Sequence, residues 1–334
     1  MNCKKSYVNY PFSGAFLLEN PLYFDIETTG LSWKNSMVFL IGFLKMDFEK
    51  DKWILEQWFL EDPSEEKELL KKFSDVLKEA PFLIHYNGQK FDLPYLKGRC
   101  QLQNIPAAWD NCRQLDLYQT LRPYQKLMGL DHMRQTDLEQ YLGICRPEEI
   151  SGKECAAVYK KYVIERNPCQ MEQILLHNHL DLTGLLDCTQ ALAYPALFQG
   201  RFQLGECRRE NDTLTCSLIP HMPLPQAFSL DCHPRPWTVS GSPHGAEITF
   251  CLENGTLRMY YPNYKDYYYL PAEDIAVHKS VGTYVDRRFR RQADALNCFT
   301  RFPCTDEFLG DMEQIHSYID NCFYLYSRGY VFAK

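Results

Sequence analysis

The 334-residue sequence lacks the features that mark membrane proteins and secreted proteins. It contains no run of about 18 apolar residues, the length that a membrane-spanning helix needs. Its first 21 residues hold no sustained apolar segment and no small-residue cleavage site of the kind found in signal peptides. None of its 14 cysteines forms a C-x-x-C pair, so the usual zinc-site spacing is missing. We therefore expect a cytoplasmic protein with reduced thiols and no membrane partner.

The sequence also lacks an excess of positive charge, internal repeats and low-complexity segments. Its formal net charge is −7, so the total gives no argument for a general polyanion-binding surface. Hydrophobic residues make up 45% of the chain and aromatic residues 14%, which is ample for packed cores and argues against disorder. The length favours two domains. A nucleic-acid partner would have to bind a local basic patch, and residues 279–291 form the most basic run.

The pattern of apolar residues predicts an α/β fold in the first part of the chain. Residues 20–30, 36–47 and 51–62 read as three strands with short connections, which predicts antiparallel neighbours. A helix is predicted within residues 62–81, with Ser64 as its candidate N-cap and Pro81 closing it, and a short, almost entirely apolar strand follows that helix. Alternation of helix and strand, and then a helical stretch to about residue 201, predict a mixed sheet flanked by helices.

The pattern of predicted secondary structure changes near residues 198–205. Short β-type runs then alternate with turn signals such as Asn-Gly, and a charged, helical tail follows. We therefore predict a first domain over residues 1–200 and a β-rich α+β region over residues 205–334, whose role the sequence does not indicate.

Acidic residues occur where an apolar strand ends. Asp25 and Glu27 lie two apart in "YFDIETTGL", so in a strand their side chains share one face. Carboxylate oxygens are the ligands that magnesium and manganese prefer, and burial of a carboxylate is costly without such a partner. The alternative for this pair by itself is a solvated strand end.

Two further segments add carboxylates and a histidine. Asp92 follows a strand–loop junction and begins a predicted helix, where an acidic residue is also an ordinary cap. His177 and Asp181 are four apart in a predicted helix and thus share one face, although such a pair is often only a surface pair. Asp116 is another acid in an apolar strand.

In this order, "FDIETTG", "HYNGQKFDLPYL" and "HNHLD" resemble the three exonuclease motifs of the DEDD superfamily of 3′–5′ exonucleases. The segment "QLDLYQTLRPYQKLMGLDHMRQTDLEQYLGI" is most similar to the YprB-like group of bacterial predicted exonucleases. The resemblance covers about residues 20–195. It implies a ribonuclease H-like fold, nucleic acid with a 3′ end as the partner, and two divalent cofactor ions, Mg²⁺ or Mn²⁺.

The resemblance also assigns roles to the residues of the motifs. It makes Asp25, Glu27, Asp92 and Asp181 the metal-binding acids and His177 the general base. His179 is a rival base, because members of the superfamily with a histidine in this motif usually have a small residue where His179 stands.

The chemistry of phosphodiester hydrolysis suits this set of residues. Two divalent ions roughly 3.5–4 Å apart can activate water and stabilise the leaving oxygen. A histidine with a reference pKa of about 6.5 can accept a proton near neutral pH. We expect Thr28, Gly30 and Asn87 to approach the substrate, because Gly30 and the Asn87-Gly88 turn permit close backbone contact.

The basic run offers a further substrate contact. Arg287 and Arg290 are predicted to bind phosphates, or alternatively to pair with acids such as Asp286 and Asp294. The sequence leaves open two other functions, a catalytically silent nucleic-acid-binding protein and a metal-dependent endonuclease. It does not distinguish DNA from RNA and does not indicate an oligomeric state.

Overall fold

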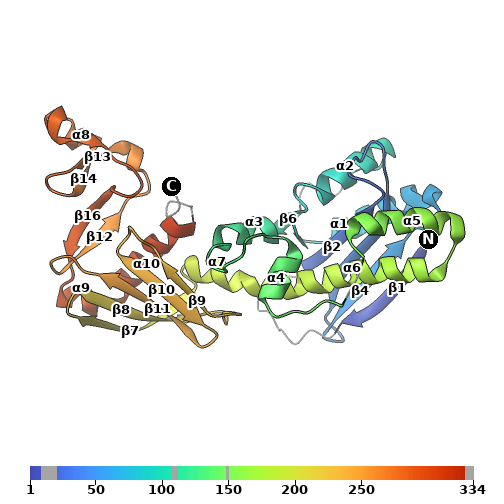
Figure 1. The fold of residues 1–334 in the computed structure, drawn as a ribbon, viewed down its shortest axis with the longest axis horizontal. Coiled ribbons are helices and arrows are strands. Elements are labelled where there is room, and N and C mark those ends of the chain that lie inside the picture. The colour runs from blue at the N-terminus through green and yellow to red at the C-terminus, as the bar shows by residue number, and fades with distance from the viewer. Residues whose placement is uncertain (9–20, 107–111, 148–149, 328–334) are drawn as a thin grey trace. The chain divides into compact units, whose positions relative to one another are not determined.

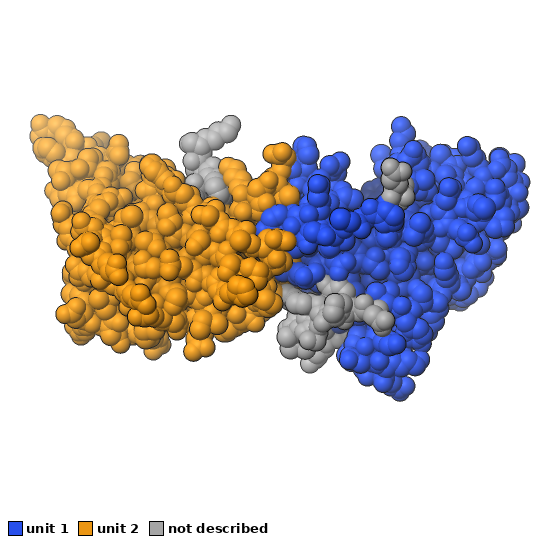
Figure 2. Space-filling view, turned by 60° about the horizontal axis from the view of Figure 1, so that its bottom comes forward, with its two compact units in different colours: residues 1–122, 132–190 blue, residues 123–131, 191–334 orange. Residues whose placement is uncertain are grey.

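The computed structural model describes residues 1–8, 21–106, 112–147 and 150–327. Within these residues the chain forms two compact units, coloured separately in Figure 2. The first unit comprises residues 1–122 and 132–190, and the second comprises residues 123–131 and 191–334. No helix within the described ranges is long and apolar enough to cross a membrane.

A six-stranded mixed sheet is the centre of the first unit, in the order β1-β4-β3-β2-β5-β6 (Figure 1). Strands β1, β4, β3 and β2 pair antiparallel, and β5 and β6 continue from β2 in parallel. The predicted antiparallel meander and the α/β fold class are thereby confirmed, and β1 is an edge strand that the sequence pattern did not predict. The strands are β1 (Asn2–Val8), β2 (Pro21–Thr28), β3 (Val38–Asp47), β4 (Lys52–Phe59), β5 (Phe82–His85) and β6 (Arg113–Asp116).

One face of this sheet is covered by α1 (Glu66–Glu79). A short 3-10 turn, η1 (Pro63–Glu65), precedes α1, and the Asp62 side chain caps that turn by accepting a hydrogen bond from the Ser64 N–H. Apolar residues of α1 recur at helical spacing and are buried. Among them, the ring of Phe73 packs 5.8 Å from that of Phe24, centroid to centroid.

The opposite face is covered by α6 (Pro168–Cys188), and α5 (Gly152–Glu165) packs beside α6 (Figure 1). Gly42 of β3, which pairs with Asp25 of β2, makes this close approach possible. A Cβ atom at Gly42 would lie 2.0 Å from Asn178 Oδ1, so any larger residue would push α6 away from the sheet. The face of β2 that carries Asp25 therefore lies directly against α6. The other helices of this unit are α2 (Asp92–Leu102), α3 (Leu117–Leu121) and α4 (Gln135–Tyr141).

The second unit is rich in β structure, as predicted. It contains a five-stranded sheet in the order β7-β8-β11-β10-β9, a pair β12-β16 and a three-stranded sheet β14-β13-β15. Its strands are β7 (Phe202–Glu210), β8 (Thr213–Pro220), β9 (Phe228–Asp231), β10 (Trp237–Ser242), β11 (Gly245–Cys251), β12 (Thr256–Tyr260), β13 (Tyr267–Leu270), β14 (Ile275–His278), β15 (Arg291–Gln292) and β16 (Phe299–Pro303).

Four helices complete the described part of the second unit, and the longest of them packs through aromatic side chains. The ring of Phe323 lies 4.6 Å from that of Phe198, centroid to centroid. The basic run is not one continuous helix. It forms a single helical turn, a 3-10 turn and a two-residue strand. The helices are α7 (Ala193–Phe198), α8 (Lys279–Gly282), α9 (Asp306–Gly310) and α10 (Met312–Ser327), and the 3-10 turn of the basic run is η5 (Arg287–Phe289).

Candidate active site

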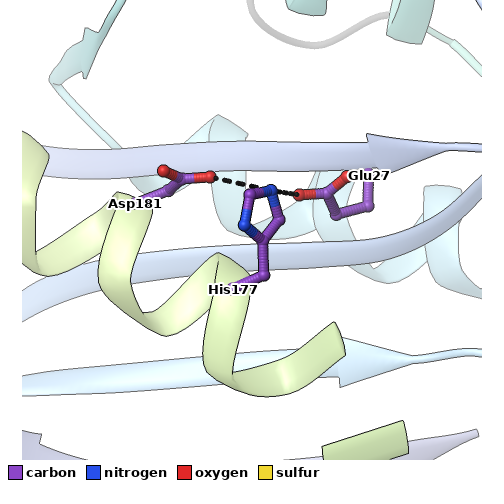
Figure 3. Close-up of side chains that lie close together, drawn as sticks. All are labelled: Glu27, His177 and Asp181. Carbon is purple, nitrogen blue, oxygen red and sulfur yellow. Dashed lines mark ion pairs between the residues drawn. The ribbon is translucent and has the colours of Figure 1, made fainter. Parts of the chain in front are cut away.

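Glu27, His177 and Asp181 come together between the end of β2 and the middle of α6 (Figure 3). His177 Nε2 lies 3.4 Å from Glu27 Oε1 and 3.4 Å from Asp181 Oδ2. One ligand atom from each residue lies within 4.8 Å of the other two. Glu27 thus lies on the face of β2 that is turned to α6, and His177 and Asp181 lie on the face of α6 that is turned to β2. Their ligand atoms are close enough to share one cation.

Asp25 is held in this site by an amide that the sequence analysis did not single out. Asn178 Nδ2 donates a hydrogen bond of 2.9 Å to Asp25 Oδ2. Gln57 of β4 in turn donates to Asn178 Oδ1 at 3.0 Å and to the Leu175 carbonyl at 2.7 Å. The only local signal for Asn178 is its position inside an apolar helix, directly after His177.

The carboxylates are close enough to perturb one another. Burial first, and then the negative charges of Asp181, Glu27 and Asp92, hold the pKa of Asp25 well above its usual range, against the hydrogen bond from Asn178. All four acids of the three motifs therefore belong to one electrostatic cluster.

Asp92 is buried at the start of α2. Burial raises the pKa of its carboxyl to about 7, and the charges of Asp116 and Asp181 act in the same direction. Backbone hydrogen bonds at Asp92 and Ile26 lower it in part. A buried carboxylate without a neutralising partner is costly. The set of carboxylate oxygens with one imidazole nitrogen fits a divalent cation such as Mg²⁺ or Mn²⁺.

Asp116 organises the loop before α2. Its carboxylate accepts hydrogen bonds from the backbone N–H groups of Asn87, at 2.8 Å, and Gln89, at 3.3 Å. Asn87 has a positive φ of 58°. A Cβ atom at Gly88 would lie 2.8 Å from the His85 ring, so glycine is required for this close turn. Asp116 thereby fixes the path of the loop that carries Asp92.

A cavity of about 630 Å³ lies beside this loop. One of its wall residues, Gln135, donates through Nε2 to the backbone carbonyl of Asp181 at 2.7 Å, so the wall touches the helix that carries Asp181. Asn87, predicted to approach the substrate, also lines the cavity. Its full lining is Tyr86, Asn87, Tyr118, His132, Met133, Arg134 and Gln135.

The turn after Glu27 contains the other two predicted substrate contacts. Thr28 Oγ1 donates to the Gly30 carbonyl at 3.0 Å, and Ser36 Oγ donates to the same carbonyl at 3.0 Å. These hydroxyls close the turn directly behind the acidic strand end. The contact of Thr28 and Gly30 with substrate remains a prediction.

His179 points away from the acids. Residues two apart on a helix differ by about 200° in direction, so His177 and His179 face opposite sides of α6. Burial, together with the charge of Lys4, lowers the pKa of His179.

Arg146 is a site residue that carries no motif and was missed by the sequence analysis. Its Nη1 donates to Asp181 Oδ1 at 2.7 Å, and its Nη2 donates to Glu139 Oε1 at 2.6 Å. Glu139 is only 1% exposed, and a Cβ atom at Gly184 would lie 1.9 Å from Glu139 Oε1. Gly184 of α6 thus leaves room for the buried Arg146–Glu139 ion pair. Arg146 binds Oδ1 of Asp181, and Oδ2 of Asp181 faces His177.

We expect Arg146→Met to destabilise the first unit by about 3–5 kcal/mol, because it leaves the Glu139 carboxylate buried and unpaired. Urea titrations in EDTA, followed by circular dichroism, measure this loss. The double variant Arg146→Met with Glu139→Gln should recover much of it. Arg134→Met is the matched control, since Arg134 pairs with Asp137 on the surface and should change little. Equal losses in the single and double variants would contradict this account.

Comparison with known proteins agrees with the fold. A family model described as the RNase_H superfamily matches residues 22–193, just over half of the chain. The uncharacterized protein YprB of Bacillus subtilis (strain 168) is 27% identical over 170 residues, which are 50% of this chain and 40% of YprB. A DNA polymerase of Methanocaldococcus jannaschii is 50% identical over 40 residues, 12% of this chain and 2% of that protein. The chain therefore spans well under two thirds of the length of either relative.

Two solved structures show a more distant similarity. The family B DNA polymerase of Pyrobaculum calidifontis matches with a TM-score of 0.43 and 15% identity, over 52% of this chain and 25% of that chain. E. coli Exonuclease I in complex with a dA16 oligonucleotide matches with a TM-score of 0.32 and 15% identity, over 60% of this chain and 54% of that chain. The similarity of the sequence to the YprB-like group and to the ribonuclease H-like fold is confirmed by the family model and by YprB. The chain belongs to the RNase_H superfamily.

Proposed function

We propose that the protein is a metal-dependent 3′–5′ exonuclease that hydrolyses phosphodiester bonds of DNA or RNA. The observation that carries the proposal is one electrostatic cluster of four carboxylates from three distant segments, two of which lie 3.4 Å from the same histidine. Asp25 and Glu27 come from β2, Asp92 from the start of α2, and His177 and Asp181 from α6. Membership of the RNase_H superfamily supports a nuclease.

Asp25, Glu27, Asp92 and Asp181 would hold the divalent ions. When bound, two such ions supply the positive charge that makes a water nucleophilic and stabilises the leaving oxygen. The four acids contribute up to four negative charges, which balance two divalent cations. Burial first, and then the charges of neighbouring carboxylates, raise the pKa values of Asp25 and Asp92, and bound cations would stabilise the charged forms.

His177 is the proposed general base. Its Nε2 faces the acids, 3.4 Å from Glu27 Oε1 and from Asp181 Oδ2, where it can accept a proton from a water held by the same carboxylates. Asn178, Gln57 and Arg146 would keep Asp25 and Asp181 in place during the reaction. These three are positioning residues rather than catalytic ones.

The 3′-terminal nucleotide is proposed to lie against the turn at Thr28 and Gly30 and the loop at Asn87. The cavity lined by Tyr86, Asn87 and Tyr118 offers aromatic and amide groups next to the loop that precedes Asp92, which suits a nucleotide. Arg287 of the second unit is a proposed contact for another part of the strand.

A time course with nucleic acid labelled at its 5′ end tests the proposal. With Mn²⁺ or Mg²⁺ we expect a ladder that shortens by single nucleotides from the 3′ end, and EDTA should stop it. A matched substrate with a 3′-terminal phosphate should be cut more slowly, because an exonuclease of this polarity uses the free 3′ end. Fragments from internal cuts in circular single-stranded DNA would instead establish the endonuclease alternative, and binding without any cutting would establish the silent one.

A further inference from the structure

The most positively charged part of the chain lies in the second unit, over residues 279–292. This segment has five basic residues and one acidic residue, a net charge of +4, whereas the whole chain has −7. The segment runs through α8, η5 and β15, next to β13 and β14. We call residues 279–291 the basic–aromatic surface.

The basic residues of this surface differ in whether their side chains already contact other groups of the protein. Arg288 pairs with Asp286, Nη2 to Oδ2, at 2.9 Å. Arg290 is half-buried, donates to the Gly282 carbonyl, and has its guanidinium 4.4 Å from the ring centroid of Tyr268. These contacts fix the local fold.

Arg287 and Arg291 are exposed, although the Arg291 guanidinium also lies 4.9 Å from the ring centroid of Tyr269. Among the residues that the structure describes, neither of them forms an ion pair with a carboxylate, nor do Lys279 and Arg290. The alternative that Arg287 and Arg290 pair with Asp286 or Asp294 is therefore not what the structure shows. Asp286 pairs with Arg288, and Asp294 accepts hydrogen bonds from the backbone and side chain of Asn297. Uncompensated arginines on an acidic protein are an electrostatic site for an anion.

Two exposed aromatic side chains belong to the same run, and the Arg288 guanidinium lies 5.8 Å from the ring of one of them, Phe289. Tyr284 is 90% exposed and Phe289 is 58% exposed. A single exposed apolar residue is ordinary on a protein surface. Two exposed rings within six residues, in the same run as arginines without acidic partners, are a different combination. Rings give a stacking platform for unpaired bases, and arginines bind the phosphates of the same strand.

We propose that the basic–aromatic surface binds single-stranded nucleic acid. Arg287 and Arg291 contact phosphates, and Tyr284 and Phe289 stack on bases. The ligand class rests on the proposed function, which makes nucleic acid the substrate. A single strand fits better than a duplex, because the bases of a duplex are already stacked on one another and leave no faces for Tyr284 and Phe289. The surface thereby gives the second unit a role in holding the strand, separate from cleavage.

Fluorescence anisotropy with a labelled 15-nucleotide single strand, oligo(dT) or oligo(U), tests this inference on the full chain in EDTA, where no cutting occurs. We expect Tyr284→Ala and Phe289→Ala each to weaken binding by about 5- to 150-fold, the range for loss of one stacked base. Arg287→Ala should flatten the slope of log affinity against log salt by about 0.7, the value for one lost phosphate contact on a single strand.

Two matched variants serve as controls. Phe48→Ala removes a ring that is 68% exposed in the first unit, and Lys52→Ala removes an exposed charge there, so both should leave affinity nearly unchanged. Unchanged affinity in both ring variants overturns the inference, and so does tighter binding of a 15-base-pair duplex than of the single strand. Because binding is measured in EDTA, the two proposals can fail separately. If the ring variants bind normally while the protein still cleaves with metal, only the proposed role of the basic–aromatic surface is refuted. If the surface variants weaken binding as expected but the wild-type protein shows no metal-dependent cleavage, the proposed nuclease activity is refuted instead.

Discussion

Asp25→Asn and Asp92→Asn are each expected to abolish metal-dependent cleavage while the fold is retained. Each change removes one negative charge and one ligand oxygen from a set of four acids that would hold two divalent ions. Initial rates on a 5′-labelled single strand at saturating Mn²⁺, with circular dichroism of the same samples, measure the effect. Asp75→Asn is the control, because Asp75 is an exposed residue of α1 that pairs with Lys78 at the surface. A folded Asp25 or Asp92 variant that cuts at the wild-type rate would show that the acids are not the metal site.

Asp92→Asn should also change how stability depends on pH in the metal-free protein. The folded pKa of Asp92 is raised to about 7, above the roughly 3.9 of an unfolded aspartate, so folding favours its neutral form. The resulting stabilisation is present below about pH 4 and is lost as pH rises toward 7. Asparagine stays neutral, so in EDTA at pH 8 the variant should melt at a higher temperature than wild type. At pH 4 the difference should shrink, and a variant that is less stable at pH 8 would contradict the raised pKa.

His177→Ala is expected to slow cleavage by about 10²–10⁴-fold, the usual effect of removing a positioned base. His179→Ala should have a much smaller effect, because His179 lies on the other side of α6. Single-turnover rates for both variants, measured over a range of Mn²⁺ concentrations, compare the two histidines directly.

The dependence on Mn²⁺ separates two roles for His177, since its Nε2 lies within reach of two metal-binding acids. A base cannot be replaced by added metal, so the rate of His177→Ala should stay low at saturating Mn²⁺. Recovery of the rate at high Mn²⁺ would make His177 a metal ligand instead. A larger loss in His179→Ala than in His177→Ala would show that His179 is the base.

The sequence by itself determined the local geometry of each motif. Asp25 and Glu27 share a face because strand side chains alternate, and His177 and Asp181 share a face because four residues make about one helical turn. Both relations depend only on the backbone period, so they hold wherever the elements lie. The antiparallel meander followed in the same way from the short connections between its strands.

Only the tertiary structure decided how the motifs meet and what supports them. Gly42 admits α6 against β2, and that approach, rather than any motif, brings Asn178 to Asp25. Arg146 reaches Asp181 across 35 residues of sequence, from a segment with neither an apolar period nor a recognisable spacing. The sequence likewise shows how many charges the basic run contains. It does not show which of the arginines contact backbone carbonyls, aromatic rings or acids. Such contacts depend on the packing of distant segments, and a local pattern carries no information about packing partners far along the chain.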